Sequence, residues 1–436
     1  MSTPNLLYIF TDQQRADTLR CYGNDQIQTP ALNGLAEESF VFENTYVSQP
    51  VCSPSRATML TGLWPHTAGV PACNVPLSAD APTIAEYLPD EYACAYMGKW
   101  HLGDEIFPQH GFDTWVGSED TYRHSFSDPA RLPQLSPYHQ FLVENGFEPD
   151  VENRGARVFS RHMAAGLEEP FTKATFLGDK AAQFIREGGD QPFALCVSYL
   201  EPHPPHTGPL NDLYDPWSLP TGPDFMKPPP ENAPLFMRLM ASYYMASEEY
   251  GYDLRTEAGW RAVRARYWGN VTLVDRSVEK ILRALDESGQ ADNTIVVFTS
   301  DHGEMLGDHG ILGKTVMYEA SVRVPMLIRA PMLGREQAVF GGNFSHIDLA
   351  PTIMDLLDQS VPERMQGRSR VPVMNGTEDL TDNDVFIEWS GRDGHIPASI
   401  GEAEVNRSMG EPYRTVVTAD RWKLNLYTRG QNELYD

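Results

Sequence analysis

The chain has 436 residues, of which 41% are hydrophobic and 11% aromatic, and its formal net charge is −26. This composition is typical of a globular protein with a large core. The negative charge argues against nucleic-acid binding, which requires clustered Lys and Arg to neutralise phosphates. It also favours a small ligand in a locally positive pocket over a long polyanion, which the overall field would repel.

The amino terminus is predicted to be a buried strand rather than a targeting segment. Five apolar residues, Leu6 to Phe10, follow a start without basic residues, and Thr11-Asp12 ends the run. A signal peptide has a basic region and a longer apolar stretch. No segment approaches the roughly 20 apolar residues of a membrane span. We therefore expect a cytoplasmic protein without a membrane segment, and the sequence indicates no oligomeric state.

The cysteines are odd in number and widely spaced. They are Cys21, Cys52, Cys73, Cys94 and Cys196. Because no two of them form a C-x-x-C pair, their spacing indicates neither a disulfide framework nor a zinc site.

Three continuous apolar runs predict the centre of the fold. Residues 6–10, 193–200 and 294–299 are each followed at once by polar residues. Runs of this length are typical of strands buried on both faces in a parallel sheet. Helical spacing from about 261 to 285, with Gly289 beyond it, predicts a helix. The sequence therefore predicts an α/β fold with a large, mixed, mostly parallel sheet covered by helices on both faces.

The domain organisation is predicted from changes in composition. Segments at about 117–190 and 207–259 are rich in Pro, Tyr and Trp and have poor periodicity, so we expect insertions over the sheet edge. Beyond residue 361, three runs at 385–389, 413–418 and 422–427 predict a small antiparallel sheet. We expect a main domain over residues 1–360 and a smaller C-terminal α+β subdomain over 361–436.

The predicted strands deliver polar side chains to one edge. Asp12, His203 and the pair Asp301-His302 each follow an apolar run. Because ligands in open α/β sheets bind beyond the carboxyl ends of the strands, these residues predict a composite active site.

The run Cys52-Ser53-Pro54-Ser55-Arg56 predicts a helix start at a reactive position. Pro54 just inside the helix places residue 52 at its N-terminus, where free N–H groups and the helix dipole favour an anion. Arg56, one turn along, could hold an oxygen on residue 52 by charge-assisted hydrogen bonds.

The segment from Cys52 to Gly62 resembles the signature of the formylglycine-dependent sulfatases of the alkaline phosphatase superfamily. Gly98-Lys99-Trp100-His101 resembles their second signature. The resemblance implies an alkaline phosphatase-like fold and hydrolysis of a small sulfated substrate. It also implies that a formylglycine-generating maturation enzyme oxidises Cys52 to formylglycine, whose hydrate attacks sulfur.

The same resemblance implies roles for four further residues. Lys99 would bind a sulfate oxygen, and His101 would act as the base that helps to expel sulfate. His203 would protonate the leaving alcohol, a role that suits imidazole, with His206 as a substitute. Lys314 would contact both the sulfate and the bridging oxygen.

A divalent cation is implied by Asp12-Gln13 and Asp301-His302, which align with the metal ligands of the family, together with residue 52. We expect Ca²⁺, with Mn²⁺ as the alternative because an imidazole ligand admits softer ions. Gln13 and His302 depart from the commonest sulfatase pattern and are similar to the phosphonate monoester hydrolase branch of the superfamily.

Two activities and one binding function therefore stand as hypotheses. The first is sulfate monoester hydrolysis, and the second is hydrolysis of phosphonate monoesters or phosphodiesters by the same residues. A third, a binding protein for sulfated ligands with unconverted Cys52, is disfavoured because binding does not need a cysteine at that helix start. The leaving alcohol stays open, although several aromatic side chains could stack on it: Trp115, Tyr122, Tyr199, Trp217, Tyr243 and Tyr244. Because family members usually continue beyond a run such as 432–436, we expect a longer natural chain.

Overall fold

The computed structural model describes residues 3–153, 156–391, 410–428 and 432–436. Its main strands are β1 (Asn5–Asp12), β2 (Phe40–Tyr46), β3 (Ala93–Gly98), β4 (Thr114–Gly117), β7 (Phe193–Pro202), β10 (Thr294–Ser300), β11 (Arg323–Val324), β12 (Met326–Arg329) and β13 (Ala338–Ser345). Within these residues they form a nine-stranded sheet in the order β11-β2-β12-β10-β1-β7-β3-β4, with β13 pairing with β2.

The strands that were predicted to be buried lie side by side in the parallel part of this sheet. β1 pairs in parallel with β10 on one side and with β7 on the other. β3 continues the parallel arrangement from β7 to β4, whereas β12 and β11 run antiparallel to their neighbours. The predicted fold class, a mixed and mostly parallel sheet in an α/β protein, is confirmed.

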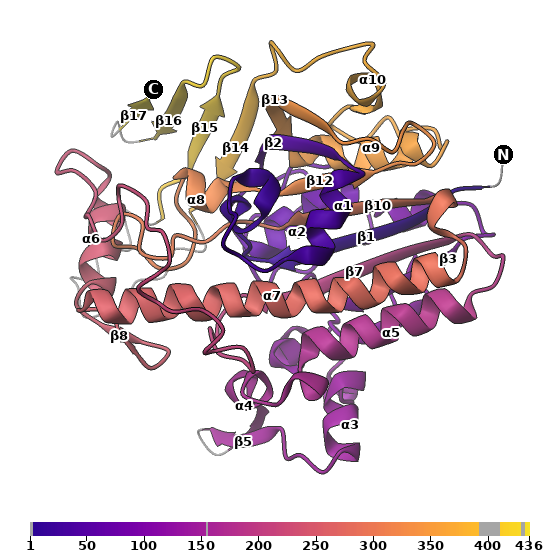
Figure 1. The fold of residues 1–436 in the computed structure, drawn as a ribbon, viewed down its shortest axis with the longest axis horizontal. Coiled ribbons are helices and arrows are strands. Elements are labelled where there is room, and N and C mark those ends of the chain that lie inside the picture. Colours follow the sequence, from indigo (N-terminus) through magenta and orange to yellow (C-terminus); the bar gives the residue numbers. More distant parts are fainter. Residues whose placement is uncertain (1–2, 154–155, 392–409, 429–431) are drawn as a thin grey trace.

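Helices cover both faces of the sheet, as Figure 1 shows. They are α1 (Pro30–Glu37), α2 (Cys52–Thr61), α3 (Pro137–Glu144), α4 (Arg161–Ala165), α5 (Lys173–Glu187), α6 (Leu235–Tyr244), α7 (Glu257–Glu287), α8 (Glu319–Val322), α9 (Leu349–Leu356) and α10 (Val371–Met374). Successive side chains of a strand point to opposite faces. Tyr8 therefore packs in a core with α2 and α9, whereas Leu7 and Ile9 pack in a second core with α1, α5 and α7.

One regular element lies inside a segment that we expected to be an insertion. α5 packs along α7 and against β7, so that residues 173–187 belong to the layer that covers the sheet. The remaining parts of the two expected insertions hold short elements: α3, α4 and α6, with the two-stranded pairs β5 (Asp150–Asn153) with β6 (Ala156–Phe159), and β8 (Glu248–Glu249) with β9 (Tyr252–Asp253). The predicted helix at 261–285 is α7, which extends a turn further at its amino end.

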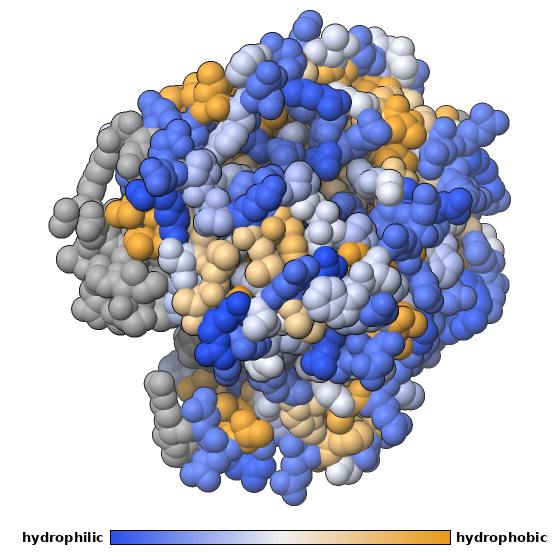
Figure 2. Space-filling model, turned by 60° about the vertical axis from the view of Figure 1, so that its left-hand side comes forward, coloured by the Kyte–Doolittle hydropathy of each residue, from blue (hydrophilic) through white to orange (hydrophobic). Residues whose placement is uncertain are grey.

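The C-terminal strands form the predicted small antiparallel sheet. They are β14 (Val385–Trp389), β15 (Tyr413–Val417), β16 (Lys423–Tyr427) and β17 (Glu433–Tyr435), paired in that order. This sheet shares a hydrophobic cluster with α6. The face drawn in Figure 2 is mainly hydrophilic. In the described ranges, no helix is long and apolar enough to cross a membrane.

Gly98, at the end of β3, is the backbone position on which the placement of Lys99 depends. Its φ is +114°, and a Cβ there would lie 1.8 Å from the carbonyl oxygen of Ser198 on β7. We expect Gly98→Ala to lower the free energy of unfolding by about 2–5 kcal/mol, from strain in the backbone and overpacking. Denaturant unfolding measures this loss.

Gly34, in the exposed part of α1, is the matched control because nothing lies within 4 Å of an added Cβ there. Gly34→Ala should change stability by less than about 1 kcal/mol, in the favourable direction. Equal effects of the two substitutions would contradict the close approach of β3 and β7.

Candidate active site

The candidate site lies at the carboxyl ends of the parallel strands. Asp12 is the last residue of β1, and Lys99 directly follows β3. His203 directly follows β7, and Asp301 directly follows β10. The side chains that the sequence predicts for the site are thus brought to one edge by the order of the strands.

Cys52 is the first residue of α2, all of whose ten residues are buried. Its side chain is 3% exposed. The Cys52 Sγ lies 3.2 Å from Lys314 Nζ and 3.3 Å from His302 Nε2. A helix N-terminus and a lysine favour an anion at this position. A hydrogen bond with Cys73, together with Lys314, accordingly lowers the pKa of the Cys52 thiol well below its usual range, although burial opposes this effect.

Cys52 also belongs to a group of side chains that could hold a cation. The ligand atoms of Asp12, Cys52, Asp301 and His302 all lie within 4.8 Å of one another, and all four residues are buried. His302 Nε2 is 3.7 Å from Asp12 Oδ1 and 3.5 Å from Asp301 Oδ1. Its Nδ1 lies 2.9 Å from the Gly303 carbonyl oxygen, to which it can donate, so the Nε2 lone pair faces the carboxylates. Two carboxylates and an oriented imidazole fit a divalent cation.

Gln13 lies beside this group and is held at both ends of its amide. Its Oε1 accepts a hydrogen bond from Lys314 Nζ at 2.6 Å, and its Nε2 donates to Glu304. Its backbone N–H donates to Asp301 Oδ1 at 3.0 Å. The residue has a positive φ of 74°, which orients the chain after β1.

Arg56 contacts different groups from those that its spacing predicted. Its Nη2 donates to Asp12 Oδ2 at 3.0 Å and its Nε to Asp301 Oδ2 at 2.8 Å. Its Nη1 donates to the Lys99 carbonyl oxygen and to Ser198 Oγ. In the described part of the chain its hydrogen bonds thus position two carboxylates and two strand ends, and none of them reaches Cys52. The predicted bond is to an oxygen on residue 52, which the thiol does not carry, so it stays a prediction.

Lys99 is fully buried and donates to Asp12 Oδ2 at 2.5 Å. Although burial opposes ionisation, Lys99 holds the pKa of the Asp12 carboxyl well below its usual range. Burial and the neighbouring Asp12 instead raise the pKa of Asp301 to about 6. A cation bound between the two carboxylates would relieve their repulsion.

His101 is positioned by residues that no sequence motif indicated. Glu105 accepts the backbone N–H groups of Trp100 and His101 at 2.7 and 2.6 Å. The His101 Nε2 lies 3.0 Å from Asn74 Oδ1, and its ring stacks on Tyr122 at 3.9 Å. Burial and Lys99 lower the pKa of His101 to about 4, so the imidazole is neutral at physiological pH.

The two candidate proton donors differ in their surroundings. His203 is half-buried, and its Nδ1 lies 2.8 Å from the Pro204 carbonyl oxygen, which leaves Nε2 for other partners. His206 is fully buried and packs edge-on against Tyr267. The position of His203 therefore suits contact with a substrate better than that of His206.

Sequence reasoning missed several residues around the site, and it named some aromatic residues that lie in the core. Asn74 was missed because it lies 27 residues from its partner His101, and Glu105 because it belongs to no motif itself. Glu304 could have been found three residues after Asp301. Tyr199 is fully buried and bonds to Ser277, so it does not line the site. Of the six aromatic candidates, Tyr122 lies directly beside His101, and its ring also faces Lys99 Nζ at 5.5 Å.

One cavity in the described part of the structure is not lined by these site residues. It measures about 570 Å³ and is lined by His309, Tyr318 and Lys423, among others. Because Cys52 is not among its lining residues, the chemistry of the side chains, rather than volume, identifies the candidate site.

Comparison with known proteins shows the family of this chain. A family model described as Sulfatase matches residues 4–359. The chain belongs to the sulfatase family. A second model, described as N-sulphoglucosamine sulphohydrolase, C-terminal, matches residues 307–436 of this sulfatase. The expected family membership and enzyme class, a sulfuric ester hydrolase, are thus confirmed.

Similar proteins include two relatives and one solved structure. The sulfatase is 31% identical to YidJ of Escherichia coli K12, described as an uncharacterised sulfatase, across 100% of this chain and 81% of that protein. It is 29% identical to an arylsulfatase of Clostridium perfringens, across 84% and 77% of the two chains. A phosphonate monoester hydrolase of Silicibacter pomeroyi has a TM-score of 0.78 and 25% identity, with 99% of this chain and 89% of that chain covered.

The cation group allows a prediction about metal affinity. Asp301→Asn removes a charged ligand, whereas Gln13→Ala removes an amide that Lys314 already engages. We expect chelation to inactivate the enzyme, and Asp301→Asn to weaken metal binding at least 10-fold more than Gln13→Ala. Calorimetric titration of metal-free protein measures both affinities. Equal losses would assign Gln13 a role as an essential ligand.

Proposed function

We propose that this sulfatase hydrolyses sulfate monoesters of small or carbohydrate alcohols through a formylglycine that a maturation enzyme makes from Cys52. The observation that carries the proposal is the position of Cys52 Sγ, at the start of α2 and 3.2 Å from Lys314 Nζ. An oxygen nucleophile at this atom would face a cationic pocket in a protein whose net charge is −26. A local reversal of the overall charge of this kind attracts a small anion.

The first step would transfer the sulfuryl group to residue 52. A hydroxyl of the hydrated formylglycine would lose its proton to solvent and attack sulfur, and the bond from sulfur to the ester oxygen would break. Lys99 and Lys314 would bind sulfate oxygens, Lys314 would also contact the bridging oxygen, and both would stabilise the developing charge. His203 would donate a proton to the departing alkoxide, so that the product is a neutral alcohol.

The second step would release sulfate. His101 accepts the proton of the remaining hydroxyl on residue 52, the carbon–oxygen bond to sulfate breaks, and the aldehyde forms again. Because burial and Lys99 lower the pKa of His101 to about 4, its imidazole is ready to accept a proton at neutral pH. Addition of water then restores the hydrate.

A divalent cation would be held by Asp12, Asp301, His302 and residue 52, with Gln13 at their side. We propose Ca²⁺, with Mn²⁺ as the alternative that the imidazole ligand allows. Such a cation lowers the pKa of a coordinated hydroxyl and neutralises developing negative charge. Within the protein, Arg56 fixes the spacing of Asp12 and Asp301, the two carboxylates that would bind the cation.

Hydrolysis of phosphonate monoesters is the second candidate function. It is supported by Gln13 and His302 and by the likeness to the phosphonate monoester hydrolase of Silicibacter pomeroyi. Sulfate is preferred here because Lys99, His101 and Lys314 surround the position of the central atom with polar donors and acceptors. A sulfate ester presents three oxygens to such groups, whereas a phosphonate ester presents a carbon substituent in place of one.

The choice is tested with matched aryl sulfate and aryl phosphonate esters. We expect a higher kcat/KM for the sulfate, a loss of several orders of magnitude in Cys52→Ala, and a mass deficit of about 18 Da on the peptide carrying residue 52. A strong preference for the phosphonate would overturn the sulfate assignment. Full activity with an unmodified peptide would refute the formylglycine.

His203 allows a prediction that depends on the leaving group. A nitrophenolate departs as an anion, whereas a sugar alkoxide needs a proton in the transition state. His203→Ala should therefore cost little with an activated aryl sulfate and about 10²- to 10⁴-fold in kcat/KM with an alkyl or sugar sulfate. The activated ester is the control. Equal losses on both substrates would make His203 a binding residue.

A further inference from the structure

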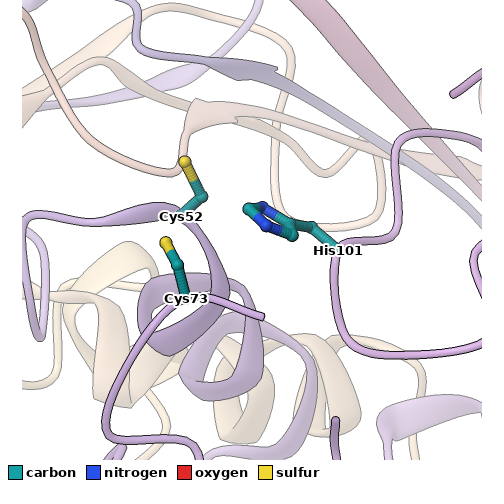
Figure 3. A group of neighbouring side chains, drawn as sticks. All are labelled: Cys52, Cys73 and His101. Atoms are coloured by element: carbon teal, nitrogen blue, oxygen red, sulfur yellow. The ribbon is translucent and has the colours of Figure 1, made fainter. Parts of the chain in front are cut away.

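A second group of side chains that could hold a metal ion also includes the Cys52 sulfur. It consists of Cys52, Cys73 and His101, whose ligand atoms all lie within 4.8 Å of one another. Figure 3 shows the three side chains as neighbours, with Cys52 above Cys73 and the imidazole ring beside them. The three residues come from separate segments: the start of α2, the loop that follows that helix, and the loop that follows β3. Only the fold brings them together, which explains why the cysteine spacing predicted no zinc site.

The His101 ring is oriented in the way that metal-bound histidines are. Its Nε2 lies 3.0 Å from Asn74 Oδ1, an oxygen that can only accept a hydrogen bond, so Nε2 carries the proton. The lone pair of the neutral ring is therefore on Nδ1. That atom is buried, makes no hydrogen bond of normal geometry with the described residues, and has the Cys52 sulfur as a neighbour. A metal ligand whose other nitrogen donates to an oxygen has this arrangement.

The ligand types select the kind of cation. Two sulfurs and an imidazole suit thiophilic ions such as Zn²⁺, whereas Ca²⁺ requires oxygen ligands. Tetrahedral zinc with bonds of about 2.0–2.3 Å would bring the ligand atoms to about 3.5–3.8 Å from one another. Cys73 is half-buried in a loop and can make this small adjustment by rotation of its side chain. A water molecule would complete the coordination.

We propose that the unconverted chain binds one thiophilic divalent cation, such as Zn²⁺, through Cys52, Cys73 and His101. The second part of this inference rests on the proposed function: when Cys52 becomes formylglycine, the site loses one of its two sulfurs. Residue 52 belongs to both ligand groups: one also contains Asp12, Asp301 and His302, and the other also contains Cys73 and His101. Replacement of its sulfur by oxygen would therefore change the preference of the pocket from a soft to a hard cation.

Co²⁺ is a suitable probe because thiolate ligands give it a charge-transfer absorption whose intensity grows with their number. The experiment uses full-length protein whose peptide at residue 52 is shown by mass spectrometry to retain the thiol. We expect a band with the intensity of two thiolates, which Zn²⁺ abolishes and excess Ca²⁺ leaves unchanged. Cys73→Ser should halve the intensity and weaken binding about 100-fold, while Cys21→Ser, the control at another half-buried cysteine, should change neither.

Asn74→Ala provides a second, independent test that leaves both thiols in place. It should weaken Co²⁺ binding about 10- to 100-fold without lowering the limiting band intensity, since it removes only the hydrogen bond that orients His101. An unchanged band in Cys73→Ser would overturn the proposal and assign the ion to the group with Asp12, Asp301 and His302. Sulfatase activity of converted protein is measured separately. Inactive converted protein with an intact two-thiolate band in the unconverted form would refute only the proposed function.

Discussion

The active-site edge of this sulfatase depends on one buried guanidinium. Arg56 is fully buried, and four hydrogen bonds from its guanidinium reach Asp12 on β1, Asp301 after β10, the Lys99 carbonyl after β3 and Ser198 on β7. A buried charge without partners would cost several kcal/mol, so these contacts are obligatory once the helix is docked. One side chain thereby joins residues on, or directly after, four strands and sets the distance between two carboxylates.

The distribution of charge follows from the same constraint. The chain is strongly acidic, yet Arg56, Lys99 and Lys314 gather where the strands end. Each of these cations is within 4.0 Å of an Asp12 oxygen, so the positive charge of the pocket is partly compensated by the carboxylates beside it. This partial compensation lowers the cost of burying the charges and allows both a cation and an anionic ester to bind.

Much of the fold and of the candidate site can be predicted from the sequence, because both are encoded in short segments. The apolar runs at β1, β7 and β10 predict buried strands, and the polar residue that follows each run lies at the same edge of the sheet. The helix start at Cys52 is equally local. What the sequence does not reveal are contacts between distant segments, such as that of Asn74 with His101 or of Arg56 with Asp301.

The partners of Arg56 illustrate this limit in physical terms. Its spacing from Cys52 on α2 is compatible with a direct bond. The recorded bonds go instead to Asp12 on β1 and Asp301 after β10, which are distant from Arg56 in the sequence. α5 is a second example, because its apolar face is buried by contacts with α7 and β7, which the local sequence of α5 does not indicate. Motifs thus identify which residues react, whereas the tertiary structure determines which residues hold them in place.

The burial of α2 has a consequence for the order of events in biosynthesis. All ten of its residues are covered, and Cys52 is 3% exposed, so the thiol cannot be reached by another protein unless the helix leaves the core. Undocking α2 would expose the Arg56 charge network and the packing with β1 and α9, which amounts to opening much of the molecule. If Cys52 is converted by a second enzyme, that enzyme must therefore act on the nascent or unfolded chain, and a molecule that folds before it is converted retains its thiol.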